Sequence, residues 1–173
     1  MAETISAAAS IATFLVIAVT AIAAIIQLRH LRQNNQLNAL LTILRMPYDP
    51  VLHDALEFID SELPDRLNDR EFMQQLDKSP VNRKVHKELD ALDYYERVGA
   101  YIKANLIDAG VYFDCSSPER YWDALKPVIK AMRSQRGPST YENFEYLILL
   151  AQRWDRNHPE GNYPPNAQRL SLD

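Results

Sequence analysis

The sequence contains few of the residues that build catalytic and cofactor sites, with one cysteine and four glycines among its 173 residues. The single cysteine, Cys115, cannot form an intramolecular disulfide, which suits a reducing compartment. The glycines are too scattered to form the glycine-rich loop that cradles a phosphate group. The four histidines are widely separated, and none has the spacing of a metal-binding motif. The sequence therefore predicts no catalytic residue, no metal site and no bound cofactor.

Charge is absent from one long stretch near the N-terminus, the run from Ile5 to Ile26, which has Phe14 near its middle. Apart from a few Ser and Thr residues, the run consists of Ala, Ile, Val, Leu and Phe. A helix of about 20 apolar residues spans a hydrocarbon core of about 30 Å, and a helix satisfies its own backbone hydrogen bonds in lipid. The run is therefore predicted to be a transmembrane helix in contact with the lipid bilayer.

A cleaved signal peptide is a competing interpretation of the same run, because Ala21-Ile22-Ala23 resembles a small-residue cleavage site. Two features favour an uncleaved anchor instead. The residues before the run, Met1 to Thr4, contain no Lys or Arg, and the run is longer than the apolar region of a typical signal peptide. A helix buried in a soluble domain is a third interpretation, but such a helix is rarely apolar on every side.

Positive charge follows the apolar run and does not precede it. The only charged side chain before the run is Glu3. The basic side chains that follow are Arg29, His30, Arg32 and Arg45. Lys and Arg residues in short flanking segments tend to stay in the cytoplasm. We therefore expect a single-pass protein of the inner (cell) membrane, with its C-terminal domain in the cytoplasm.

The helical pattern continues beyond the apolar run. Residues 27–45 contain no Gly or Pro, and leucines recur at helical spacing at positions 37, 40, 41 and 44. We expect residues 1–46 to form the anchor and a juxtamembrane helix that serves as a stalk. The neutral amides between Gln33 and Asn38 have two interpretations. They either set the register of a homo-oligomer through this helix, as buried Asn does in coiled coils, or form a polar stalk surface.

The rest of the chain is long enough for one compact domain with a hydrophobic core. Its apolar residues recur at helical spacing, and no run alternates as a strand does. The predicted fold class is all-α, with the transmembrane helix and stalk followed by a small helical bundle over residues 47–157. Residues 158–173 are rich in turn formers and are predicted to be an irregular or disordered tail.

Capping residues predict where the helices of this domain begin. Asp49-Pro50, Ser79-Pro80 and Ser117-Pro118 each place a capping side chain before a proline at the first helical position. Ser139, with Glu142 three residues later, resembles a capping box. The predicted helices cover approximately residues 50–62, 69–77, 80–104, 107–113, 118–135 and 140–156.

The segment 80–104 is predicted to be the central helix, because its apolar residues cover two faces. Gly99 is expected to admit the close approach of a neighbouring backbone. Glu96 and Arg97 lie among the aromatic residues of this segment, and an unpaired buried charge is costly. We expect Arg97 or Glu96 to join the central helix to the segment 141–146 through charge-assisted hydrogen bonds. The alternative is that the pair lines a ligand pocket.

Charge is unevenly distributed along the chain. The formal net charge of −4 argues against general nucleic-acid binding, which usually needs a basic face. Acidic residues predominate in the segment 47–77, whereas basic residues predominate in the segment 120–136. Either the two segments are solvated faces of adjacent helices that attract one another, or the basic segment meets anionic lipid headgroups or an acidic partner.

Several short segments of the domain resemble a known family. They are Tyr94-Tyr95-Glu96-Arg97-Val98, Leu106-Ile107-Asp108, Arg120-Tyr121-Trp122, Leu125-Lys126-Pro127 and Tyr141-Glu142-Asn143-Phe144-Glu145. Over about residues 1–156 the chain is similar to an uncharacterised bacterial family with a domain of unknown function. The resemblance implies one N-terminal membrane helix and a small α-helical cytoplasmic domain. It implies no activity and no catalytic residue.

Two classes of function are compatible with these features. The first is a membrane-tethered helical interaction module, which binds an unknown protein partner or itself at the inner membrane. The second is a ligand sensor or enzyme whose pocket is assembled from the helical domain without a linear motif. A protein captured from membranes with the anchor intact favours the first class, whereas a small molecule that stabilises the domain favours the second.

Overall fold

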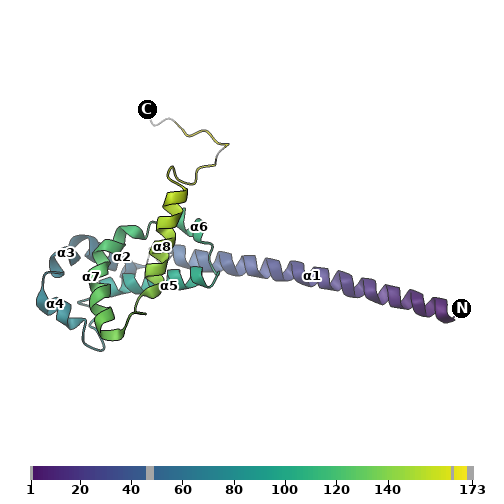
Figure 1. Cartoon of the computed structure of the whole chain (residues 1–173), viewed down its shortest axis with the longest axis horizontal. Helices are drawn as coiled ribbons and strands as arrows, with labels where there is room; N and C mark the ends of the chain where they lie inside the picture. The colour runs from purple at the N-terminus through teal and green to yellow at the C-terminus, as the bar shows by residue number, and fades with distance from the viewer. Residues whose placement is uncertain (1, 46–48, 165, 171–173) are drawn as a thin grey trace. The chain divides into compact units, whose positions relative to one another are not determined.

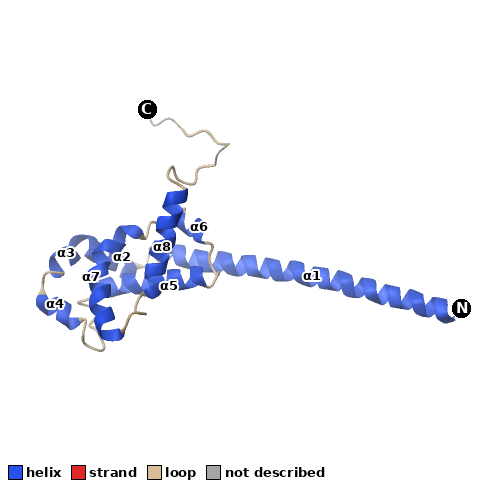
Figure 2. Cartoon of the chain, in the orientation of Figure 1, coloured by secondary structure: helices blue, strands red, loops and turns tan. Residues whose placement is uncertain are grey.

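The computed structural model describes residues 2–45, 49–164 and 166–170, without the side chains of residues 2–12 and Leu44. The described part of the chain has an all-α fold (Figure 2), as predicted from the sequence. Its helices are α1 (Ala2–Arg45), α2 (Pro50–Ser61), α3 (Leu63–Arg66), α4 (Arg70–Gln75), α5 (Glu88–Lys103), α6 (Ala109–Phe113), α7 (Glu119–Arg136) and α8 (Glu142–Asn157). The chain divides into two compact units, one ending at Ala39 and the other starting at Leu40.

The first unit, which ends at Ala39, contains most of the long apolar part of α1. Thr13–Ile43 is long and apolar enough to cross a membrane, and no residue of its most apolar stretch is buried. Phe14 and Ile26 are 70% and 49% exposed. The side chain of Ile5 lies outside the described part, although its backbone belongs to α1. The predicted helix is therefore present, and from Thr13 to Ile26 its large apolar side chains are exposed.

The second unit has α5 at its centre (Figure 1). This helix contacts both α2 and α8, and its buried residues lie on two faces, which explains the two apolar faces read in the sequence. The ring of Tyr95 stacks on Phe144 of α8 with centroids 4.9 Å apart, and Phe144 lies 5.3 Å from Trp122 of α7. Ile43, near the end of α1, is also buried in the core of this unit.

The prediction that the central helix begins at Pro80 is wrong, because α5 begins at Glu88. The intervening residues form turns around Asn82. Its side chain accepts a hydrogen bond from the Lys84 N–H, and its carbonyl accepts hydrogen bonds from the N–H groups of Val85 and His86. Asn side chains that bond to nearby backbone groups compete with helix formation. This local turn replaces the helical turns that the Ser79-Pro80 pair predicts.

The other predicted helix starts have mixed outcomes. Asp49 caps α2 as predicted, with its Oδ1 accepting a hydrogen bond from the Val51 N–H at 2.9 Å. The helix α7 begins at Glu119, one residue after the predicted start at Pro118. The predicted capping box at Ser139 is wrong, because Tyr141 occupies the N-cap position of α8 in the left-handed region, with φ 56°. Turn hydrogen bonds over residues 137–142 replace that box.

Candidate functional site

Glu96 connects the middle of α5 to the first turn of α8. Its Oε2 accepts a hydrogen bond from the backbone N–H of Phe144 at 2.9 Å, and its Oε1 accepts one from Nδ2 of Asn143 at 2.8 Å. Among the described residues, α8 has no capping side chain at its own N-cap position. A carboxylate at a helix N-terminus satisfies free N–H groups and interacts favourably with the helix dipole. Glu96 therefore caps α8 from a neighbouring helix.

Two further residues on the same face of α5, Gly99 and Lys103, contact the first turn of α8. A Cβ atom added at Gly99 would overlap the backbone carbonyl of Asn143, so the absence of a side chain there admits the close approach that was expected. One turn later, Nζ of Lys103 lies 3.3 Å from Oδ1 of Asn143 and 3.6 Å from Oε1 of Glu142. The start of α8 therefore packs against α5 through Glu96, Gly99 and Lys103.

Arg97 points to a different part of the surface, because adjacent helical residues are separated by about 100° around the axis. It is exposed and lines a surface depression of about 360 Å³ with Asp49, Asp90 and Asp93. Asp93 also accepts a hydrogen bond from the Tyr141 hydroxyl at 3.1 Å. The hydrogen bonds predicted to reach the segment 141–146 are therefore made by Glu96. Whether Glu96 and Arg97 act together as a stabilising pair stays a prediction.

The acidic and basic segments identified in the sequence meet between α2 and α7. Arg120 of α7 forms an ion pair with Asp60 of α2, with Nη2 2.6 Å from Oδ2, and its guanidinium lies 5.2 Å from the centroid of the Tyr121 ring. These three side chains line a broad surface groove of about 530 Å³ together with His53 and Glu57. This contact matches the interpretation that the two helices attract one another.

A buried polar pair at the start of α5 was not identified from the sequence. His86 and Glu88 are both fully buried, with Nδ1 of His86 2.7 Å from Oε1 of Glu88. The ring of Phe72 covers His86 at a centroid distance of 4.2 Å. Burial raises the pKa of the Glu88 carboxyl, while the hydrogen bond with His86 opposes that rise. Because both side chains are shielded from solvent, we interpret the pair as part of the packed core.

The sequence around Glu88 does not predict this burial. Charged residues lie close to it at Lys87 and Asp90, which is typical of a solvated surface. Within the described residues, no group of three or more His, Cys, Asp or Glu side chains is placed to hold a metal ion. Cys115 is exposed and free. Glu96, Lys103 and Arg120 are the polar side chains described above that connect one helix to another.

These observations define an all-helical domain that follows a long apolar N-terminal helix. A family model described as a domain of unknown function, DUF4760, matches residues 14–154. The chain therefore belongs to the DUF4760 family. The match includes most of the apolar helix as well as the helical domain. No curated protein and no solved structure matches the chain.

Proposed function

We propose that this protein is a membrane-tethered helical interaction module. In this proposal α1 is an uncleaved single-pass anchor in the inner membrane, and the domain lies in the cytoplasm, where it binds a protein partner or a second copy of the chain. One observation carries the proposal. From Thr13 onward α1 exposes apolar side chains. The same helix continues without a break to Arg45, and its residue Ile43 is buried in the core of the domain.

This continuity supports an anchor over a cleaved signal peptide. Cleavage after Ala23 would cut α1 in the middle, and would leave an exposed apolar stretch that includes Ile25, Ile26 and Leu28 on the remaining protein. Exposed apolar surface costs roughly 25 cal/mol per Å² in water. Lipid removes this cost for an intact helix. The basic residues after the run support the cytoplasmic location of the domain.

The stalk supports self-binding as one form of interaction. Leu37 and Leu41 lie one helical turn apart and are 53% and 42% exposed. Exposed leucines at this spacing are typical of helices that pair through an apolar stripe. Homo-oligomerisation through the juxtamembrane helix is therefore included in the proposal, beside recognition by the helical domain.

Proximity labelling in living cells tests the interaction role. A labelling enzyme is fused after Asp173 of the full chain, and the control carries the same enzyme after Arg45, so that it retains the anchor and lacks the domain. We expect the full chain to label a reproducible set of proteins that the control does not label. If the two labelling profiles are the same, the domain binds no other protein specifically, and that part of the proposal fails.

A further inference from the structure

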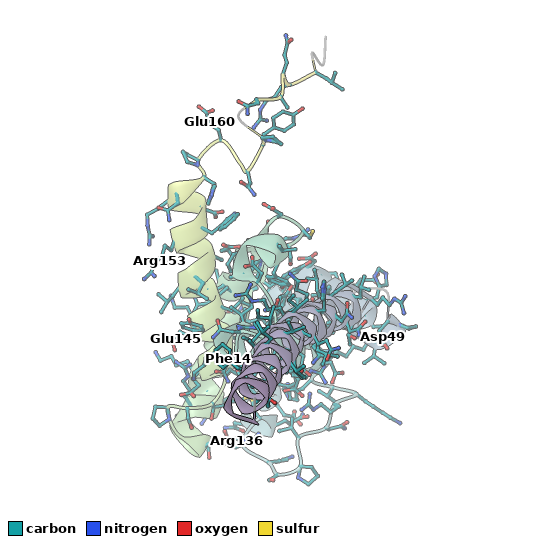
Figure 3. The ribbon with its side chains drawn as sticks, turned by 90° about the vertical axis from the view of Figure 1, so that its right-hand side faces the viewer. Phe14, Asp49, Arg136, Glu145, Arg153 and Glu160 are labelled. Carbon is teal, nitrogen blue, oxygen red and sulfur yellow. The ribbon has the colours of Figure 1, made fainter. Side chains whose placement is uncertain are left out.

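The outer face of α8 remains exposed after the helix has packed against its neighbours. Tyr146 and Leu149 on this face are 38% and 58% exposed. Figure 3 shows Arg153 on the side of α8 that is turned away from the other helices. The exposed stripe follows helical spacing and consists of Glu142, Tyr146, Leu149, Arg153 and Arg156.

Charge is arranged along this face with opposite signs at its two ends. Glu142 lies seven residues before Leu149, and Arg156 lies seven residues after it. Glu145 lies four residues before Leu149, and Arg153 lies four residues after it. If a second α8 is laid antiparallel across the first, with a two-fold axis at Leu149, each acidic residue faces an arginine of the other helix. The face is therefore complementary to itself, as an isologous dimer interface requires.

We infer that the outer face of α8 binds a second copy of this chain, in an antiparallel arrangement centred on Leu149. This inference rests on the proposed function, because it names a second copy as a partner of the tethered domain. In the dimer Glu142 pairs with Arg156 of the second copy, and Glu145 pairs with its Arg153. The two Leu149 side chains meet at the centre, with Tyr146 beside them.

Within the described part of a single chain, the four charged side chains of this interface are either unpaired or still partly exposed to solvent. Arg153 and Arg156 form no ion pair within the described residues. Glu142 has only a 3.6 Å contact with Lys103, and both side chains are more than half exposed. Glu145 contacts Arg133 at 2.7 Å and is still 46% exposed. An anionic membrane would attract the arginine end and repel the glutamate end, whereas a second copy satisfies both ends.

The size of the face predicts an association that depends on the membrane. One helix face buries less than the approximately 1,600 Å² of a standard stable interface. Confinement of both copies to one membrane raises their effective concentration, which reaches the millimolar range for short tethers. We therefore expect dimers of the full chain in membranes, and little association of the domain alone at micromolar concentration.

Cysteine crosslinking of the full chain in membranes tests the arrangement, with Cys115→Ser as the background. Leu149→Cys places the new thiols at the two-fold axis, within reach of a disulfide after mild oxidation. Glu142→Cys is the matched control on the same face, because its two copies lie about 21 Å apart along antiparallel helices. We expect dimers of Leu149→Cys and none of Glu142→Cys alone. A mixture of Glu142→Cys with Arg156→Cys is expected to yield the mixed dimer.

A charge reversal separates recognition from misfolding. Adding Arg156→Glu to Leu149→Cys is expected to reduce the crosslinked fraction several-fold, and adding Glu142→Arg to the same chain is expected to restore it. If Leu149→Cys gives no dimer, or if Glu142→Cys crosslinks equally well, the α8 arrangement is overturned. Crosslinking of Leu37→Cys without crosslinking of Leu149→Cys also overturns it, in favour of the stalk. None of these results affects domain-dependent proximity labelling of other proteins, which tests separately whether the domain binds a protein partner.

Discussion

Replacing Glu96 by Ala is expected to lower the free energy of unfolding of the domain by about 2 to 4 kcal/mol. The change removes the acceptor for the Phe144 N–H and for the Asn143 amide at the first turn of α8. Loss of a helix cap costs about 0.5 to 2 kcal/mol, and loss of a hydrogen bond to a charged group costs about 1.5 to 3 kcal/mol. Denaturant titration of the full chain in detergent, followed by the near-UV signal of the buried aromatic residues, measures the change.

Arg97→Ala is the matched control for this experiment. Arg97 is the next residue along α5, but it is exposed at the surface depression. Exposed substitutions usually change stability by less than about 0.5 kcal/mol. Glu96→Gln is expected to lie between the two, because it keeps an oxygen acceptor and loses the negative charge. Equal unfolding midpoints for Glu96→Ala and the parent would show that the α5–α8 junction does not depend on Glu96.

Replacing Gly99 by Ala is expected to destabilise the domain by about 1 to 3 kcal/mol, the usual cost of overpacking. The added methyl group would overlap the Asn143 carbonyl, which is backbone and cannot move aside without shifting the first turn of α8. Helix propensity alone predicts the opposite sign, since Ala in a helix interior is more favourable than Gly by roughly 0.5 to 1 kcal/mol.

The two effects predict opposite signs for the change in the free energy of unfolding of Gly99→Ala. The same denaturant titration measures that sign. Lys103→Ala serves as a comparison, because it alters the same contact with α8 through an exposed side chain and is expected to have a small effect. A Gly99→Ala protein that is more stable than the parent would contradict the close approach of the two helices.

The sequence predicted the features of the fold that depend on local signals. The charge-free run predicted the apolar part of α1, and Asp49 before Pro50 predicted the start of α2. The apolar residues on two faces predicted that α5 lies at the centre of the domain. In each case the signal lies within a few helical turns and needs no knowledge of the neighbouring helices.

The features that the sequence did not predict depend on contacts between distant residues. The start of α8 is capped by Glu96, which lies 48 residues before Phe144, so the local Ser139–Glu142 pattern predicted the wrong cap. Asn82 forms a turn where Ser79-Pro80 predicted a helix. His86 and Glu88 are buried, and the ring of Phe72 lies 4.2 Å from that of His86. Polar residues in a local sequence give no sign of such burial.

Labelling of Cys115 in oriented membrane vesicles tests the proposal that an uncleaved α1 holds the domain in the cytoplasm. Cys115 is exposed and is the only cysteine in the chain, so a membrane-impermeant maleimide reports the side on which the domain lies. We expect a membrane-retained chain of 19.9 kDa that is labelled in inside-out vesicles and not in sealed right-side-out vesicles. A shorter chain released by an alkaline wash, or labelling of right-side-out vesicles, would contradict it.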